Sequence, residues 1–562
     1  MSRAGSWRRI ALGVFPIVGL AAITLLSANV LRIVRTYPSD PDGNAVAYLI
    51  LLALAVSAVV YYWPIAHAAR DRPGDLRRSR LELLLGALPT ELPRAWAGLL
   101  FVGAALTWTL LNYRVDSVYT TPDTDSYASV GEAGLRSQAF WAGERPPTVP
   151  LVLRIFGLST GVLNDPSSFP HHARVFTRFQ SILSAAAFIV LGLAVASHVR
   201  HWWLKACALA IVVAFGMTMD VSQWNRMLTS ESLSTSFLTL WIALWLVALH
   251  AWREGNHLST LRRVALGLGL GVLGVLYSFA RDANAFLLLA LSIALALGLA
   301  SRRVRAHTAV RAYLALTVFL AGVFLLQYGL MGRAGRWVVP LANVLHERIL
   351  PSEEGRSFLA AAGLRVEVLP AGILSSDCGD DCDEFHLQLM VGKGGRVLLD
   401  WIRLSGKATY LRYLASHLSR AFMEPAANAE ELLSGDPTEY RNRAYPDPQS
   451  ALHLRNIFYP RSTGVVLFWA AALLLGMIAM LFTEPPRIAA LIPLILLLTA
   501  YPLMLVVWHG DAAEVERHAT QIGFQVRLAL WMGTVIGLDC LWTRGFARRK
   551  VRESSDTALT RR

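Results

Sequence analysis

Long apolar runs separated by short charged connectors make up most of this chain. A membrane-spanning helix needs about 20 consecutive, mostly apolar residues to cross the hydrocarbon layer. By this measure the pattern predicts about twelve spans and an all-α polytopic membrane protein. The predicted spans are 10–31, 46–67, 95–112, 176–198, 202–219, 231–251, 264–279, 284–300, 311–330, 463–482, 488–507 and 525–543.

One break in this pattern decides the orientation of every later span. Apolar sequence is nearly continuous on both sides of Arg281 and Asp282, so it can form two spans or one long bent helix. We predict two spans, which places the Arg281 turn on the outer side. A single helix would invert everything that follows.

Basic residues gather in every second connector, for example around Arg77, Arg262 and Arg303, and again in the C-terminal tail. Short cytoplasmic loops of membrane proteins carry an excess of Lys and Arg. We therefore predict a multi-pass protein of the plasma (inner) membrane with both termini in the cytoplasm. Arg32 and Arg35 are exceptions, because they fall on the predicted outer side of the first span.

This orientation places the long polar segments outside the membrane, so any active site is expected to face outward. The expected organisation is two N-terminal helices and a cytoplasmic loop in 1–94, a core of spans in 95–330 with a first outer loop at 114–174, a large outer segment in 331–461, three C-terminal spans in 462–543 and a cytoplasmic basic tail in 544–562.

The composition argues against two other classes of protein, soluble enzymes and nucleic-acid-binding proteins. Of the 562 residues, 54% are apolar and 16% are charged, a balance with which a soluble enzyme would struggle to cover its surface. The net charge of +14 would suggest nucleic-acid binding in a soluble chain, but membrane orientation explains the basic clusters better. We expect a lipid bilayer as a partner, and no nucleic acid.

The first outer loop opens with an Asp-x-Asp pair, Asp123 and Asp125, and later contains Arg145-Pro-Pro and Pro150. Alone, such a pair is more typical of a turn and a helix N-terminus, where carboxylates accept backbone N–H bonds. Its position changes that interpretation, because it begins the first large outer loop and a Pro-rich segment leads back to the membrane.

In combination, these features resemble the GT-C superfamily of integral-membrane glycosyltransferases, which includes protein O-mannosyltransferases, aminoarabinose transferases and arabinofuranosyltransferases. Members carry an acidic motif early in the first outer loop, juxtamembrane helices and a Pro-rich return to the membrane. The resemblance covers roughly 95–340 in layout. It is carried by Asp123, Asp125, Ser126, Tyr127, Arg145, Pro146, Pro147 and Pro150. Two spans precede the usual first one, so either aspartate can be the functional acid.

The resemblance implies transfer of a sugar from a polyprenyl-phosphate donor to a hydroxyl of a glycan, lipid or protein acceptor. This chemistry needs a base for the acceptor proton and cations for the departing phosphate. Asp123 or Asp125 can supply the base. Nucleotide sugars, which soluble glycosyltransferases bind through a metal on Asp-x-Asp, are not expected outside the membrane. The sequence indicates no definite cofactor and leaves a divalent cation open.

Two more polar groups interrupt the predicted spans on the outer side. Glu231 follows Thr229 and Ser230 at the start of a span, so it is either a functional carboxylate or part of a helix cap. Arg281 can pair with Asp282 and reach the interface, or it can bind the donor phosphate with its guanidinium group.

The last polar cluster runs from His509 to His518. His509, Asp511 and His518 could bind a metal by residue type, but their spacing matches no standard zinc pattern. The alternatives are a charged helix start or a donor site lined by Arg517 and His518. We predict no metal site. The predicted site residues are Asp123, Asp125 and Glu231 for catalysis, and Tyr127, Arg145, Arg281, Asp282, Asn284, Arg517 and His518 for substrate binding.

The large outer segment offers two smaller predictions. Cys378 and Cys382 lie close together among acidic residues, and outside the membrane they can form a disulfide. The stretch 397–422 mixes apolar and basic residues, a composition that suits a helix at the membrane interface.

Two other classes of protein compete with the glycosyltransferase interpretation. A transporter or lipid flippase commonly has about twelve spans, but it generally shows internal repeats and helices broken near the midplane. We find neither in the sequence. A non-catalytic assembly protein with a GT-C fold would be marked by loss of the acidic residues, and here both Asp123 and Asp125 are present.

Overall fold

A computed structural model of the protein describes residues 118–253, 260–300, 310–374, 389–434, 458–481, 488–513 and 515–559. The first three predicted spans and the predicted Cys378–Cys382 disulfide lie outside these residues. The chain divides into two compact units, Met1–Asp116 with His201–Ala206, and Ser117–Arg200 with Cys207–Arg562. The second unit contains all of the candidate site residues.

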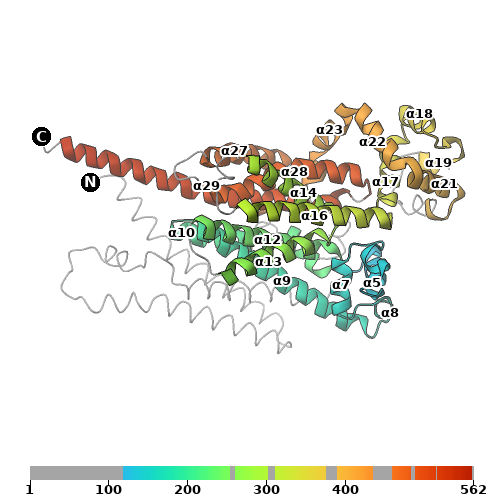
Figure 1. Ribbon diagram of the computed structural model, residues 1–562, viewed down its shortest axis with the longest axis horizontal. Helices are drawn as coiled ribbons and strands as arrows, with labels where there is room; N and C mark the ends of the chain where they lie inside the picture. The colour runs from blue at the N-terminus through green and yellow to red at the C-terminus, as the bar shows by residue number, and fades with distance from the viewer. Residues whose placement is uncertain are drawn as a thin grey trace, which may run out of the picture. The chain divides into compact units, whose positions relative to one another are not determined.

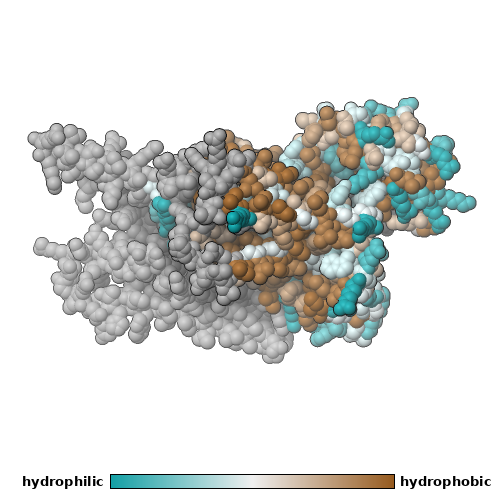
Figure 2. All heavy atoms as spheres, viewed as in Figure 1, coloured by the Kyte–Doolittle hydropathy of each residue, from teal (hydrophilic) through white to brown (hydrophobic). Residues whose placement is uncertain are grey.

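Long apolar helices dominate the described part of the chain, which contains no strand beyond an isolated bridge between Tyr119 and Met227. Within the residues that the structure describes, seven helical segments are long and apolar enough to cross a membrane: Phe169–His198, Ser230–Ala251, Asp282–Leu299, Tyr313–Ala334, Thr463–Met480, Ile488–Gly510 and Val515–Thr543. Each coincides with a predicted span, and apolar side chains cover much of the visible face of these helices (Figure 2). These helices indicate a membrane protein, as expected.

Two predicted spans differ from the observed helices. The range 202–219 corresponds to Leu204–Gly216 and Asp220–Arg226, which are bent by 57° relative to each other. Polar residues that include Asp220 and Gln223 follow the apolar run and are buried, which accounts for the end of the straight helix. The range 264–279 forms a shorter apolar helix, Val264–Ser278. The described residues therefore support seven spans, or eight if the bent pair is one span.

The predicted break at Arg281 is present. Helix α13 (Thr260–Ser278) ends before it, and the 3-10 turn η2 (Asp282–Asn284) leads into α14 (Ala285–Ala300). Asn284 secures the break, because its Nδ2 donates to the Tyr277 carbonyl and to Ser234 Oγ, each at 2.8 Å.

Short helices lie at one end of the long ones (Figure 1). The Asp-x-Asp pair lies in the first turn of α5 (Pro122–Glu132), which is followed by α6 (Gln138–Trp141), α7 (Thr148–Ile155) and α8 (Thr160–Leu163). The amide of Thr148 donates to the carbonyl of Phe279 at 3.1 Å, which joins α7 to the turn after α13. The first outer loop is therefore attached directly to the Arg281 break.

The long helices pack in neighbouring pairs. Close contacts join α9 (Phe169–His198) to α12 (Ser230–Arg253), α14 to α16 (Val310–Ala334), and α28 (Leu491–Gly510) to both α29 (Val515–Leu559) and α27 (Thr463–Leu481). The ends of α12 and α29 carry polar residues, and α29 begins ten residues before the span predicted at 525–543. Arg517 and His518 therefore lie on the first turns of a helix.

The large outer segment folds around an apolar core of its own, which includes Leu345, Leu359, Leu398, Ile402 and Tyr413. Its elements are α17 (Val338–Val344), the π-helical turn η3 (Leu345–Ile349), α18 (Glu353–Ala361), η4 (Val366–Val368), α19 (Ala371–Leu374), α21 (Lys393–Trp401), the π-helical turn η5 (Ile402–Gly406), α22 (Lys407–Ser416), α23 (Leu418–Ala427) and α24 (Ala429–Ser434).

Candidate functional site

A network of charged side chains joins the first turns of α5, α12 and α29 to the break before α14. The loop before α5 is fixed to the segment before α12 by backbone pairing: Tyr119 N–H donates to Arg226 O, and Leu228 N–H donates to Tyr119 O, both at 3.1 Å. Thr124 Oγ1 adds a hydrogen bond to the Leu228 carbonyl at 3.2 Å. This pairing brings the acid of the first outer loop close to Glu231, far away in sequence.

Asp123 lies between two guanidinium groups. Arg145 donates to its Oδ1, and Arg517 Nη2 donates to its Oδ2 at 2.6 Å. Arg145 is itself positioned by Ser126 Oγ, which its Nε contacts at 2.6 Å, and by the ring of Tyr127, whose centroid lies 5.1 Å from the guanidinium carbon. Tyr127, predicted to bind substrate, is buried, and its ring packs under the Arg145 guanidinium.

Glu231 forms the buried centre of the network. Its Oε1 accepts a hydrogen bond from Arg517 Nε at 2.8 Å and lies 3.4 Å from Arg281 Nη1. Arg517 therefore bridges Glu231 and Asp123, the two carboxylates predicted to be functional. A carboxylate that is only 1% exposed would be costly without such partners.

Arg281 connects Glu231 to a second group of polar residues. Its Nη2 lies 2.8 Å from His518 Nδ1, and His518 Nε2 lies 3.5 Å from Asp511 Oδ2. Asn343 Nδ2 donates to the other oxygen of Asp511 at 2.8 Å. Because a guanidinium group can only donate, His518 Nδ1 must accept, which leaves the proton of a neutral imidazole on Nε2, towards Asp511.

The network is buried in the middle and accessible at both ends. The side chains of Glu231 and Arg517 are 1% and 4% exposed, whereas those of Arg145 and His518 are 31% and 32% exposed. Arg281 is also buried, and its Nη1 makes no hydrogen bond to any residue that the structure describes. The arrangement thus keeps a guanidinium N–H available inside a water-poor site.

Electrostatics favour an anionic ligand in this network. Three guanidinium groups, those of Arg145, Arg281 and Arg517, gather around the carboxylates of Asp123 and Glu231. Burial raises the pKa of Asp123, but Arg517 and Arg145 outweigh it and hold that pKa below the ordinary 3.8. Asp123 is therefore ionised at neutral pH, and it lies between two of these guanidinium groups.

The two aspartates of the Asp-x-Asp pair have different surroundings. Positions two apart on a helix point in directions that differ by about 200°, so both cannot face the same neighbours. Asp123 faces the network, while Asp125 is exposed and has no hydrogen bond or ion pair with any described residue. The geometry distinguishes two residues between which the sequence could not choose.

Two other predicted binding residues lie in a separate set of bonds. Asp282 does not pair with Arg281; it accepts bonds from Arg336 Nε and Nη2 at 2.8 and 3.0 Å, and from Gln327 Nε2 at 2.7 Å. Arg336 also donates to the Gly143 carbonyl at 3.0 Å. Asn284 is occupied by the helix break described above. These contacts hold the first outer loop and the ends of α14 and α16 together.

Sequence reasoning missed Arg336 and the orienting role of Asn343. Arg336 directly follows the outer end of a span, where a basic residue is ordinary, and Asn343 lies in an apolar helix. No spacing rule connects either residue to its partner, because Asp282 and Asp511 are distant in sequence. Among the described residues, no group of three His, Cys, Asp or Glu side chains could hold a metal ion.

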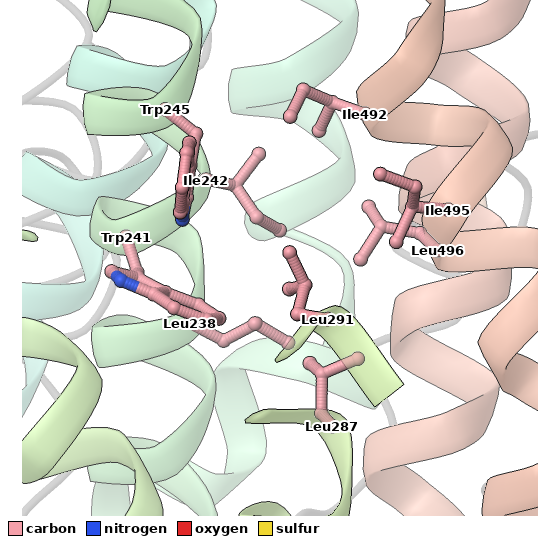
Figure 3. Close-up of a pocket in the computed structure, with 9 residues that line it drawn as sticks. All are labelled: Leu238, Trp241, Ile242, Trp245, Leu287, Leu291, Ile492, Ile495 and Leu496. Atoms are coloured by element: carbon pink, nitrogen blue, oxygen red, sulfur yellow. The ribbon is translucent and has the colours of Figure 1, made fainter. Parts of the chain in front are cut away.

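An apolar cavity of about 20 Å³ lies among α12, α14 and α28 (Figure 3). Its lining is Leu238, Trp241, Ile242, Trp245, Leu287, Leu291, Ile492, Ile495 and Leu496. This volume suits about one water molecule, and an apolar lining gives such a molecule few partners. The cavity is too small for a lipid chain, so it does not define a substrate site.

Comparison of the chain with protein-family models, with curated proteins and with solved structures finds no match. The residues themselves are therefore the basis for a functional proposal.

Proposed function

We propose that this protein is a membrane glycosyltransferase of GT-C type, which moves a sugar from a polyprenyl-phosphate donor to an acceptor hydroxyl at the outer face of the membrane. The observation that supports this most is the convergence of Asp123, Glu231 and three arginines at the ends of membrane-spanning helices. A phosphate on a lipid needs this combination of cationic ligands and a location next to the bilayer.

Asp123 is the proposed general base. In the proposed reaction, the acceptor oxygen forms a bond to the anomeric carbon as the bond from that carbon to the phosphate oxygen breaks. The acceptor proton passes to the Asp123 carboxylate, which is ionised because Arg517 and Arg145 lower its pKa. Asp125 is the alternative base, but its exposure gives it no cationic partner to share with a phosphate.

The arginines have the complementary role. The leaving polyprenyl phosphate carries the charge that develops in this reaction, and guanidinium groups match phosphate oxygens in pairs. Arg281 is the first choice for this contact, because its Nη1 is buried without a hydrogen bond among described residues. Glu231 keeps Arg281 and Arg517 oriented through its shared Oε1.

Competition for the same arginines would couple donor binding to catalysis. Arg517 and Arg145 make Asp123 a weak base while they contact it. A donor phosphate that draws either guanidinium towards itself weakens this contact and makes Asp123 more basic. The base would then gain strength only when a donor is present.

The test is a transfer assay on purified protein in nanodiscs with a panel of polyprenyl-phosphate sugars, in which released polyprenyl phosphate is measured. We expect release from at least one sugar donor in the presence of an acceptor extract, and its loss in Asp123→Asn. Movement of intact lipid-linked sugar across vesicles without bond cleavage would instead support the flippase alternative and contradict the proposal.

A further inference from the structure

Helix α23 lies against a membrane-spanning helix rather than in the outer core. The hydroxyl of Tyr501, on α28, donates to the carbonyl of Phe422, and His509 Nε2 donates to the carbonyl of Ala421 at 2.8 Å. Tyr501 precedes the end of α28 at Gly510 by more than two turns, or about 13 Å of helix. These bonds therefore place α23 beside a part of α28 that belongs to a candidate span.

The far face of α23 is apolar and uncovered. Leu418, Phe422 and Met423 are 59%, 50% and 63% exposed, and together they span an arc of about 140° around the helix. Ala421 and Pro425 lie outside this arc and are buried, so the three exposed side chains form one broad apolar stripe. Tan and brown side chains extend from the helical bundle over this region (Figure 2).

Exposed apolar side chains continue on the elements that precede α23. Leu404, on η5, is 86% exposed, and Leu411, on α22, is 57% exposed. The beginning of this helix is attached to another candidate span, because the Lys407 ammonium lies 4.4 Å from the ring centroid of Tyr328 on α16. The segment is therefore anchored to α16 near one end and to α28 near the other.

Its charges suit an anionic lipid surface. The segment 393–427 contains six Lys or Arg residues and two acidic residues. Of the basic ones beside the stripe, Arg403 pairs with Asp400, whereas Arg412 donates to the hydroxyl of Thr409 at 3.2 Å and forms no ion pair with a described residue. Cationic side chains next to an exposed apolar stripe are the arrangement of helices that lie in a membrane interface.

From this geometry we infer that residues 404–423 form an interfacial anchor, in which α23 is immersed in the outer leaflet and α22 lies along its anionic surface. The partner is the lipid bilayer itself. The apolar stripe continues the lipid-facing surface of α28, where Leu498 is 56% exposed. This anchor is independent of the proposed sugar transfer, because it uses none of the network residues.

The experiment is site-directed spin labelling in vesicles of phosphatidylethanolamine and phosphatidylglycerol, with Cys207, Cys378, Cys382 and Cys540 replaced by Ser. Labels at Leu418→Cys and Met423→Cys are compared with two controls. Leu498→Cys on α28 reports a lipid-facing position, and Ser357→Cys, exposed on α18, reports an aqueous one. Collisions with oxygen, which concentrates in the bilayer, and with a water-soluble nickel chelate are measured for each label.

We expect the oxygen-to-nickel accessibility ratio at Leu418→Cys and Met423→Cys to match that of Leu498→Cys and to exceed that of Ser357→Cys several-fold. A ratio equal to that of Ser357→Cys would overturn the inference, because the stripe would then face water. Protection of both labels from both reagents, with spin–spin broadening, would overturn it in favour of a second copy of the chain.

Discussion

Two sets of guanidinium–carboxylate contacts lie near the ends of candidate spans, and they differ in how many of their polar atoms make hydrogen bonds. Arg336 makes three hydrogen bonds, two to the Asp282 carboxylate and one to the Gly143 carbonyl. Gln327 donates a further hydrogen bond to the Asp282 carboxylate. In the Glu231 network one carboxylate oxygen serves both Arg281 and Arg517, and Arg281 keeps a buried N–H without a hydrogen bond.

This difference separates structure from function. A saturated ion pair has no capacity left for a ligand, so the Asp282–Arg336 pair can only hold the fold together. An incompletely satisfied buried cation costs free energy in the absence of a ligand, and a ligand that supplies the missing acceptor recovers it. We therefore expect the first set to contribute to stability, and we propose substrate binding for the second.

The largest expected effect comes from removal of the shared carboxylate. Glu231→Gln keeps the shape of the side chain but removes the buried counter-charge beside Arg281 and one of the carboxylates that Arg517 contacts. Loss of one partner from a buried pair costs about 3 to 5 kcal/mol. We expect a drop of several degrees in the apparent melting temperature in nanodiscs. Exposed Glu353→Gln on α18 is the control; equal melting of both variants would show that Glu231 carries no stabilising role.

Next comes the contrast within the Asp-x-Asp pair. Asp123→Asn removes the proton acceptor and should lower turnover by roughly a hundredfold or more. Asp125→Asn is the matched control, because this side chain is exposed and without a partner among described residues. Turnover is measured as polyprenyl-phosphate release. A larger loss in Asp125→Asn would reverse the assignment of the base.

A smaller effect is expected from the saturated pair. Arg336→Ala removes three hydrogen bonds, and a hydrogen bond to a charged group contributes at most about 1.5 to 3 kcal/mol to stability. Water can replace part of this loss, because Asp282 is 25% exposed. The apparent melting temperature should fall while the affinity for polyprenyl phosphate stays within about twofold, since no network atom is removed. Lost affinity with unchanged melting would place Arg336 in the binding site.

The smallest effect is a pH dependence. The pKa of Asp123 is lowered in the folded protein, so its contribution to stability is fully present above its unfolded pKa of about 3.9 and is lost as pH falls through the folded value. As pH is lowered from about 5, the apparent melting temperature of wild type should therefore fall more than that of Asp123→Asn. Identical profiles would show that Asp123 does not titrate with folding.

The sequence was sufficient for the parts of the fold that depend on long periodic signals. Runs of apolar residues predicted each of the seven candidate spans, because length and hydropathy decide membrane insertion. The bend between Gly216 and Asp220 was missed, since an apolar run continues into polar residues that become buried only through tertiary contacts.

The candidate site could be predicted by residue type but not by partner. Charged residues at the ends of predicted spans identified Glu231, Arg281 and Arg517 as candidates, because a charge next to the hydrocarbon layer is costly unless it is paired or functional. Their pairing depends on how α12 and α29 pack, so it could not be predicted from residues adjacent in sequence. Asp282, adjacent to Arg281, pairs with Arg336 instead.

The most direct test is a binding titration of polyprenyl phosphate against polyprenol, for wild type, Arg281→Ala and Arg281→Lys in nanodiscs. A charge-assisted hydrogen bond contributes about 1.5 to 3 kcal/mol, so Arg281→Ala should weaken phosphate binding by roughly ten- to a hundredfold. Arg281→Lys should recover only part of this, and polyprenol binding should be weak and unchanged in all three. Equal affinity of wild type and Arg281→Ala for polyprenyl phosphate would contradict the assignment of this network to a lipid-linked phosphate.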